Sequence, residues 1–213
     1  MVEGALIEPF TIGLYALKLW LSLRDPHSPP VGEARVGILG AGPIGLGLLL
    51  AAKAKGLSSI FATDPVSFRR NAARASGAVW VGRPDTENLI PDLLARNPQG
   101  LDAVFECCGD QAALDQAADL LKPGGALVII GIPETGRISF DIDRMRRREI
   151  RILNVRRQND TTGEAVSLAA SRSTDISFLG TPALPLREVS SAFQQASDYR
   201  NGVLRAIIDF SLP

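Results

Sequence analysis

The residues most able to do chemistry in this 213-residue chain form one short turn, Gly40-Ala41-Gly42-Pro43-Ile44-Gly45. A strand-like stretch (VGIL) precedes the turn, and a stretch rich in Leu and Ala follows it. In that setting Gly40 permits a tight turn, Gly42 lets the backbone approach a pyrophosphate, and Gly45 lets a helix pack closely on the strand. The free amides and positive dipole end of the helix would then hold the phosphates. The bare motif also occurs as a purely structural strand–turn–helix.

Asp64 strengthens the interpretation of the turn as a dinucleotide site. It ends the next strand-like stretch, 19 residues after Gly45. A carboxylate there can accept both hydroxyls of an adenosine ribose and would repel a 2′-phosphate, which favours NAD over NADP. Arg69 and Arg70 follow one turn into the next helix-like stretch. They could neutralise a 2′-phosphate, or form a solvated face with one arginine packed beside the ribose, so the choice between NAD and NADP stays open.

Strand-like and helix-like segments alternate around these residues. Such alternation implies right-handed crossovers and a parallel sheet covered on both faces. Six strands in this rhythm predict an α/β fold with a doubly wound parallel sheet of the Rossmann type. A helix at 10–23 precedes the pattern, and residues 159–213 break it, with helices expected at 164–171 and 186–197 and a closing strand at 203–210. The expected strands are 35–39, 59–63, 78–81, 103–107, 126–130 and 150–155, and the expected helices between them are 43–55, 67–76, 86–96 and 111–121.

Composition excludes several classes of function. Lys plus Arg and Asp plus Glu both total 23, so no global pull on nucleic acid or anionic lipid is indicated. The seven arginines between Arg144 and Arg157 are interleaved with acidic residues and lack stacking aromatics, so we expect no nucleic-acid partner. The longest uncharged run within the strand–helix pattern, 36–52, contains five glycines and a proline, so we expect no membrane span.

Cysteine and histidine usage limits the metal and redox chemistry. The two cysteines, Cys107 and Cys108, are adjacent, and we expect both to be buried small hydrophobes in a reducing compartment. Because the N-terminus lacks a basic stretch and carries Glu3 and Glu8, no signal peptide is indicated, and we expect a cytoplasmic protein. With His27 as the one histidine, the chain cannot assemble an ordinary zinc site of spaced Cys and His ligands.

Beyond these motifs, nearly the whole sequence resembles one family, the zinc-type medium-chain dehydrogenases of the alcohol dehydrogenase superfamily. The similarity is greatest to the polyol (sorbitol-like) and threonine dehydrogenase branches. The matching stretches are ALIEPFTIGLYALK (5–18), VGILGAGPIGLGLLLAAKAKG (36–56), ATDPVSFRRNAARASGA (62–78), LDAVFECCGDQAALDQAADLLKPGGALVIIGIP (101–133) and FLGTPALPLREVSSAFQQA (178–196).

The resemblance implies roles for individual residues. The loop FECCG (105–109) matches a loop that lines the coenzyme crevice, and the backbone at 130–132 matches the wall that receives the nicotinamide carboxamide. Arg157 matches an arginine of the polyol branch that reaches toward cofactor or substrate, and is the one catalytic candidate. That branch has an aromatic residue where this chain has Gln158, which weakens a sorbitol-like assignment. The expected cofactor-binding residues are Gly40, Gly42, Pro43, Ile44, Gly45, Asp64, Arg69, Cys108, Ile130, Gly131 and Ile132.

The resemblance also implies a domain division. In the family a catalytic domain of GroES-like β architecture, which supplies the zinc ligands, precedes the ALIEP segment, so we expect roughly 150 residues to be missing before Met1. Residues 1–30 would end that domain, 31–158 would form the NAD-binding domain, and 159–213 would return to the catalytic domain. Glu8 matches a glutamate near the catalytic metal, although one carboxylate cannot hold zinc, and an exposed glutamate before a proline is the competing interpretation.

The implied function is the coenzyme-binding portion of an NAD(H)-dependent alcohol or polyol dehydrogenase that transfers hydride between a secondary alcohol and NAD. The alternative is a non-catalytic nucleotide-binding module or an inert remnant of such an enzyme. The expected partners are NAD(H), a small alcohol or polyol, and further copies of the chain. A homo-oligomer is expected because a missing domain would leave apolar surface exposed near Tyr15, Leu19 and Leu23, with Trp20 beside them.

Overall fold

A parallel sheet of six strands forms the centre of the structure, a computed structural model that describes residues 2–171, 174–198 and 202–213. The strands lie in the order β3-β2-β1-β4-β5-β6, and all neighbouring pairs are parallel. This order is that of the doubly wound dinucleotide fold, so the predicted fold class is confirmed. The strands are β1 (Arg35–Leu39), β2 (Ser59–Thr63), β3 (Trp80–Gly82), β4 (Leu101–Glu106), β5 (Leu121–Ile129) and β6 (Arg151–Asn154).

The winding direction of the sheet reverses beside β1. The chain passes from β1 to β2 and β3 on one side, and then crosses to β4 on the other side. Leu39, at the end of β1, pairs in register with Thr63 of β2 and with Glu106 of β4. The three strands therefore end at one level, and the residues that follow them meet in the crevice where open α/β sheets bind their ligands.

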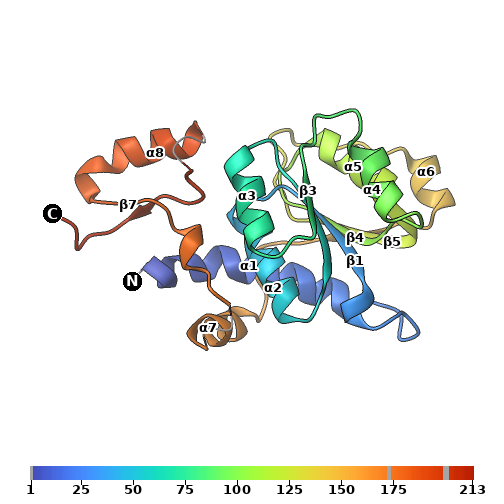
Figure 1. Cartoon of the computed structure of the whole chain (residues 1–213), viewed down its shortest axis with the longest axis horizontal. Helices are drawn as coiled ribbons and strands as arrows, with labels where there is room; N and C mark the ends of the chain where they lie inside the picture. The colour runs from blue at the N-terminus through green and yellow to red at the C-terminus, as the bar shows by residue number, and fades with distance from the viewer. Residues whose placement is uncertain (1, 172–173, 199–201) are drawn as a thin grey trace.

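Helices cover both faces of the sheet (Figure 1). On one face lie α1 (Val2–Ser22), α2 (Pro43–Ala54) and α3 (Ser67–Ala75), and on the other lie α4 (Leu89–Arg96), α5 (Gln111–Leu120) and α6 (Ile142–Arg147). Strand β4 shows why both layers form: Ala103 and Phe105 pack into the first layer and Val104 into the second. Successive strand side chains point to opposite faces, so an apolar strand buries both.

Helix α1 belongs to the main core, although it precedes the first strand. A Cβ atom at Gly13 would lie 2.5 Å from the backbone nitrogen of Leu48, so a glycine is needed for α1 and α2 to approach this closely. Trp20 packs edge-on against Phe105 of β4, with ring centroids 5.8 Å apart. By length and composition α1 could also cross a membrane, a test that buried helices of soluble proteins pass as well.

The N-terminal boundary of α1 differs from the prediction of a helix over 10–23, because the helix begins at Val2 and continues through Pro9. Proline has no amide hydrogen to donate within a helix, which normally disfavours that position. Leu6 and Phe10, on either side of the proline, are both 0% exposed. Their burial against α2 and the sheet holds the helix together across the proline.

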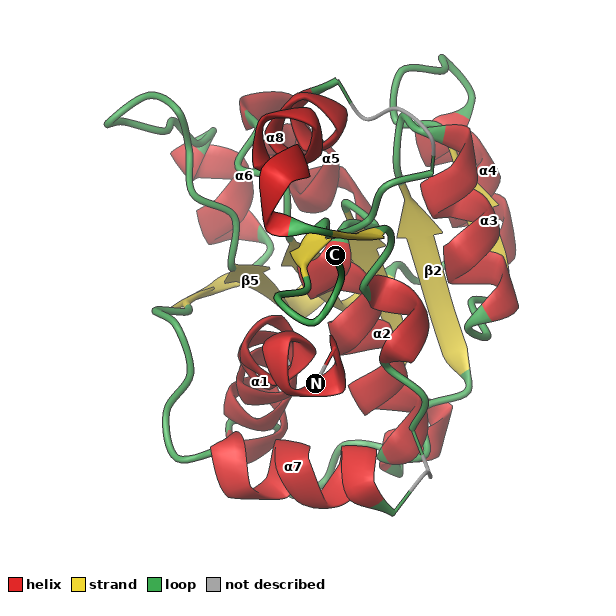
Figure 2. Ribbon diagram, turned by 90° about the vertical axis from the view of Figure 1, so that its left-hand side faces the viewer, coloured by secondary structure: helices red, strands yellow, loops and turns green. Residues whose placement is uncertain are grey.

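The chain after β6 leaves the sheet. Helix α7 (Thr162–Ala170) packs beside α1 (Figure 2). Its Glu164 pairs with Lys18 at 3.0 Å and with Lys55 at 2.5 Å. A separate two-stranded parallel sheet follows, made of β7 (Ala183–Leu184) and β8 (Ile207–Ile208), with α8 (Val189–Ser197) between them in sequence. Short 3-10 helices occupy Val31–Glu33, Ser177–Leu179 and Leu186–Glu188.

Other parts of the predicted element pattern also need correction. The closing strand predicted at 203–210 is only the two-residue β8, because it pairs with the short β7, which was not predicted. Strand β5 begins at Leu121 rather than at residue 126, and its turn Pro123-Gly124-Gly125 is an irregularity inside the strand. Helix α6 was missed, although Asp141 before it caps its start by accepting a hydrogen bond from the Arg144 amide at 3.1 Å.

Candidate functional site

The glycine turn joins β1 to α2 at the point where the winding reverses. Gly40 has a φ of +99°, a conformation that favours glycine, and its amide donates to the Thr63 carbonyl at 2.9 Å. Gly42 is the N-cap of α2 and has no side chain to satisfy the amides of the first turn. Among the described residues a Cβ atom at Gly42 would meet only the Arg69 guanidinium, at 3.8 Å, so the backbone here is open to an anion.

Gly45 lies where the helix and the turn are closest. A Cβ atom at this position would be 1.9 Å from the Gly40 carbonyl oxygen and 3.2 Å from Cγ2 of Ile38. Backbone cannot yield to such a contact, so the close packing predicted for the third glycine of the motif is present in the structure. Pro43 and Ile44, between Gly42 and Gly45, face the cavity described below.

Asp64 is a buried carboxylate, 2% exposed, that turns back over the glycine turn. Its Oδ2 accepts a hydrogen bond from the Ala41 amide at 2.9 Å, and its Oδ1 accepts one from the Val66 amide at 2.8 Å. Carboxylate oxygens accept more than one hydrogen bond each, so these contacts fix the side chain and leave it able to accept others.

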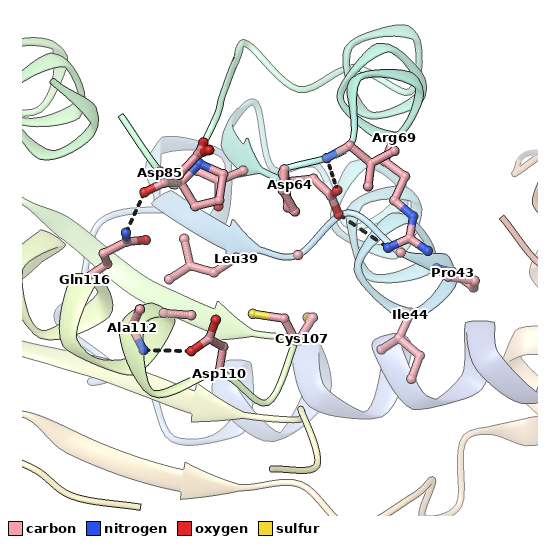
Figure 3. Close-up of a pocket in the computed structure, with 18 residues that line it drawn as sticks. Leu39, Pro43, Ile44, Asp64, Arg69, Asp85, Cys107, Asp110, Ala112 and Gln116 are labelled. Carbon is pink, nitrogen blue, oxygen red and sulfur yellow. Dashed lines mark hydrogen bonds and ion pairs between the residues drawn. The ribbon is translucent and has the colours of Figure 1, made fainter. Parts of the chain in front are cut away.

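The two arginines after Asp64 are both engaged with it. Nη1 of Arg69 lies 3.8 Å from Oδ2 of Asp64 (Figure 3). Nη1 of Arg70 donates to the backbone carbonyls of Asp64 and Pro65, at 2.7 and 2.8 Å. Arg69 therefore lies beside the acid predicted to bind the ribose, whereas Arg70 stabilises the chain at Asp64 and Pro65, just after β2.

A cavity of about 740 Å³ opens above these residues at the carboxyl end of the sheet. Its volume is within the range of small-molecule and cofactor sites, roughly 300–1,000 Å³. Figure 3 shows Asp64 and Arg69 on one side of the cavity, with Cys107 and Asp110 on the other. Of the predicted cofactor-binding residues, those that line it are Gly40, Gly42, Pro43, Ile44, Asp64, Arg69 and Cys108.

The cavity wall also includes residues that were not predicted, among them Pro84, Asp85, Asp110 and Gln116. Nε2 of Gln116 donates to the Pro84 carbonyl at 2.8 Å, which ties α5 to the loop after β3. Asp110 caps α5 by accepting a hydrogen bond from the Ala112 amide at 3.0 Å. The signal that could have found Pro84, Asp85 and Asp110 is their position just after β3 and β4, since strand ends on both sides of β1 border the crevice.

Ile130, Gly131 and Ile132 do not line this cavity. The amides of Ile130 and Gly131 donate to the Glu106 carbonyl at 2.9 and 3.0 Å, so the segment after β5 is joined to the loop after β4. Ile132 is 89% exposed. The predicted role of these residues toward a nicotinamide stays a prediction.

The cysteines are less buried than predicted, since Cys107 is half-buried and Cys108 is exposed. They follow the end of β4, where the chain turns toward the crevice instead of continuing into the core. Loss of contact with water is the largest cause that raises the thiol pKa values, and the negative charge of Glu106 is the next. The pKa of Cys107 lies well above its usual range, and that of Cys108 is raised to about 12. Both thiols therefore stay protonated near neutral pH, which disfavours nucleophilic chemistry.

Arg157 and Glu8 also lie outside the cavity wall. Arg157 is exposed and has a φ of +56°, unusual for a residue with a side chain. Glu8 is exposed on α1, and its Oε2 lies 3.8 Å from Nη2 of Arg205.

The donor set for a zinc ion is insufficient. Among the described residues no group of three or more His, Cys, Asp or Glu side chains could hold a metal ion. Zinc sites in proteins use four ligands, or three with a water, and nitrogen or sulfur donors are usual. Glu8, next to an arginine, does not meet that requirement, so the described residues do not fit a zinc ion.

The doubly wound sheet, with a glycine turn and a buried acid at its switch point, defines a Rossmann-type α/β protein. The chain belongs to the zinc-binding dehydrogenase family, whose model matches residues 43–171.

Individual relatives agree with this membership. Sorbitol dehydrogenase of Bacillus subtilis is 30% identical, over 97% of this chain and 56% of the relative. A putative D-xylulose reductase of Agrobacterium fabrum is 32% identical, over 93% of this chain and 54% of the relative. An Escherichia coli oxidoreductase/dehydrogenase of unknown specificity has a similar crystal structure, with a TM-score of 0.87 and 27% identity over 98% of this chain and 58% of that chain. The chain thus spans about half the length of the curated relatives it matches.

Proposed function

We propose that this chain binds NAD(H) and is the coenzyme-binding portion of an alcohol or polyol dehydrogenase. The observation that carries the proposal is the Asp64 carboxylate, held 2.9 Å from the Ala41 amide of the glycine turn. A pyrophosphate at the start of α2 and an adenosine ribose at Asp64 would occupy adjacent parts of one cavity. The alcohol or polyol class of substrate is supported by the names of the similar proteins, sorbitol dehydrogenase and D-xylulose reductase.

NAD is the proposed coenzyme rather than NADP. A 2′-phosphate would lie against the negative charge of Asp64, and the two nearby arginines are already engaged with the side chain or the backbone of that residue. NAD, when bound, supplies hydride acceptance and donation at its nicotinamide ring. The residues of this chain bind and orient the coenzyme, with amides at the start of α2 for the phosphates and Asp64 for the ribose.

The zinc, the substrate site and the catalytic role of Arg157 belong to the proposal only through the family resemblance. We also propose that residues 31–158 form the coenzyme domain, that residues 1–30 come from the end of a catalytic domain and that residues 159–213 return to it, with α1 nevertheless packed into the core of the coenzyme domain. A cytoplasmic, homo-oligomeric protein completes the proposal. Its support is the pair of free thiols at Cys107 and Cys108, together with exposed apolar side chains such as Phe193 and Phe210.

Calorimetric titration of the chain with NADH and with NADPH tests the proposed function. We expect saturable binding of NADH and weaker binding of NADPH, because only the latter carries a phosphate opposite Asp64. Absence of binding at millimolar NADH would refute the proposal.

The alternative, a nucleotide-binding module without catalysis, is favoured for the isolated chain by the lack of a zinc ligand set among the described residues. Adding zinc, NAD and a panel of polyols to the chain distinguishes an active dehydrogenase from a nucleotide-binding module without catalysis. We expect coenzyme binding without zinc-dependent NADH production. Zinc-dependent oxidation of a polyol would show that the chain is itself an active enzyme.

A further inference from the structure

Glu106, the last residue of β4, is a buried carboxylate that the coenzyme motifs do not include. It is 0% exposed. Within the described part of the chain its carboxylate accepts hydrogen bonds from two backbone amides, pairs with no cationic side chain, and leaves Oε2 without a hydrogen-bond partner. A buried carboxylate without a cation is costly, and only the backbone amides that donate to it offset that cost. The position therefore calls for a role other than stability.

The carboxylate organises the loop that follows β4. Its Oε1 accepts hydrogen bonds from the amides of Cys108 at 2.6 Å and Gly109 at 2.5 Å. The chain therefore turns around this oxygen immediately after the strand. Cys107 (Figure 3) and its neighbour Cys108 are part of the cavity wall.

The same residue joins that loop to the segment after β5. The Glu106 carbonyl accepts the amides of Ile130 and Gly131. A Cβ atom at Gly131 would lie 2.6 Å from Oε2 of Glu106 and 2.2 Å from the Gly109 nitrogen. A Cβ atom at Gly109, whose φ is +74°, would lie 2.4 Å from the Ile132 carbonyl oxygen. Two glycines thus let the loops close over the carboxylate.

The loop held by Glu106 also touches the glycine turn across the cavity floor. A Cβ atom at Gly40 would lie 3.2 Å from the carbonyl carbon of Cys107 and 3.3 Å from Cβ of Cys108. The position of the Cys107–Cys108 backbone therefore sets the distance between this side of the cavity and the glycine turn.

We propose that Glu106 is a positioning residue for the coenzyme: its buried carboxylate fixes the wall Cys107–Gly109 at the separation from the glycine turn that admits the dinucleotide. This inference rests on the proposed function, because it assumes that the cavity takes NAD(H). In this inference Glu106 does not contact the coenzyme. It acts on the binding site through the hydrogen bonds that it accepts from the amides of Cys108 and Gly109.

The test compares two substitutions of one residue. Glu106→Gln keeps an oxygen that can accept the amides, whereas Glu106→Met has a similar length and cannot accept them. Glu87→Gln, at an exposed glutamate, is the matched control. For each protein, folding is checked by circular dichroism, and the dissociation constants of NADH and ADP-ribose are measured by calorimetry.

We expect Glu106→Gln to bind both ligands within about threefold of the original chain and Glu106→Met to bind them at least about tenfold more weakly, roughly the loss of one hydrogen bond to a charged group. A folded Glu106→Met variant with unchanged affinities would overturn the inference, and so would equal losses in both variants. If the original chain itself binds no NADH, the proposed function fails instead.

Hydrogen exchange of the unsubstituted chain covers the case in which Glu106→Met does not fold. The amides of Cys108 and Gly109 should exchange as slowly as those of β4, because the carboxylate holds them. Exchange at the rate of an exposed loop would show that Glu106 does not fix this wall.

Discussion

Asp64 has two kinds of partner in the proposed complex, and its substitution must be chosen to separate them. The Ala41 and Val66 amides already donate to its carboxylate, so removing the side chain would loosen the glycine turn as well as the ribose site. Asparagine keeps one oxygen for an amide and removes the charge, which makes it the more informative change.

Asp64→Asn should weaken NADH binding about tenfold and raise the affinity for NADPH relative to NADH. A hydrogen bond to a charged group contributes about 1.5–3 kcal/mol, and about 1.4 kcal/mol corresponds to tenfold in affinity. Calorimetry with both coenzymes measures the ratio, with Asp92→Asn on the exposed face of α4 as the control. An unchanged ratio would show that Asp64 does not select the coenzyme.

Gly45→Ala should lower the free energy of unfolding by about 3 kcal/mol and abolish coenzyme binding, because the added Cβ would lie 1.9 Å from the Gly40 carbonyl oxygen. Urea unfolding gives the change in stability. Gly136→Ala is the control, since a Cβ atom there meets nothing within 4 Å. Equal stability of the two variants would contradict the packing described for the turn.

At the scale of residues, the part of the cavity wall that could be predicted is the part contained in one continuous motif. Gly40 to Gly45 and Asp64 follow from a strand, a turn, a helix and a second strand in direct succession. Asp85 and Gln116 come from separate segments, and their approach depends on how the loop after β3 meets α5. No local spacing contains that information. The prediction that both cysteines are buried was wrong, because a strand pattern does not show where the chain leaves the core.

Among the elements, α1 shows most clearly how packing decides what local sequence leaves open. Its glycine at position 13 would be a weak point in an isolated helix, yet it is required where α1 crosses α2. Strands β1 and β2 have the predicted bounds, because apolar runs between turn residues are sharply limited. The short β7 and β8 exist only by pairing with each other, so neither has a strong signal of its own.

Gly13→Ala should lower the free energy of unfolding by about 2 kcal/mol, because its Cβ would lie 2.5 Å from backbone of α2 that cannot move aside. Gly4→Ala in the same helix meets nothing within 4 Å and should leave stability equal or slightly higher. Thermal and urea unfolding of the pair measure the difference. Equal effects of the two substitutions would mean that α1 and α2 do not cross as described.

The contact of α7 with α1 and α2 should depend on pH. The pKa of Glu164 is lower than its ordinary value of 4.5. The hydrogen bond from Lys55 is the largest cause, and the one from Lys18 adds to it, whereas partial burial acts in the opposite direction. A carboxyl whose pKa is lower in the folded state stabilises the protein above the unfolded pKa, and that contribution is lost as the pH falls through the folded pKa. Glu164→Gln should therefore cost about 1 kcal/mol at pH 7, and nothing once both states are protonated.

Urea unfolding of the chain and the Glu164→Gln variant, from pH 7 downward, follows this difference, with Glu87→Gln as the control. A difference that stays constant with pH would show that the ion pairs do not act on stability.

Over the whole molecule, the most exposed large apolar side chains do not lie on the predicted stripe of α1. Trp20 is 2% exposed, and of the expected stripe only Leu23, at 46%, is clearly exposed, because α1 is packed among α2, α7 and the sheet. The larger exposed side chains lie near the C-terminus, where Phe193 is 74% and Phe210 76% exposed. Phe193 and Phe210 are far apart in the sequence, so no regular spacing of apolar residues predicted that they would be exposed.

The exposed phenylalanines Phe193 and Phe210 lead us to expect self-association that increases with concentration. Sedimentation velocity should show a dimer at high concentration, and Phe193→Ser should reduce its share, whereas Val79→Ser on another exposed segment should not. A single monomeric species across a broad concentration range would contradict the expected homo-oligomer.

The most direct measurement of the central claim is a crystal structure of the chain with NADH bound. The pyrophosphate should lie against the amides at the start of α2, above Gly42, and both hydroxyls of the adenosine ribose should donate to Asp64. A coenzyme bound elsewhere, or one whose ribose does not contact Asp64, would contradict the account.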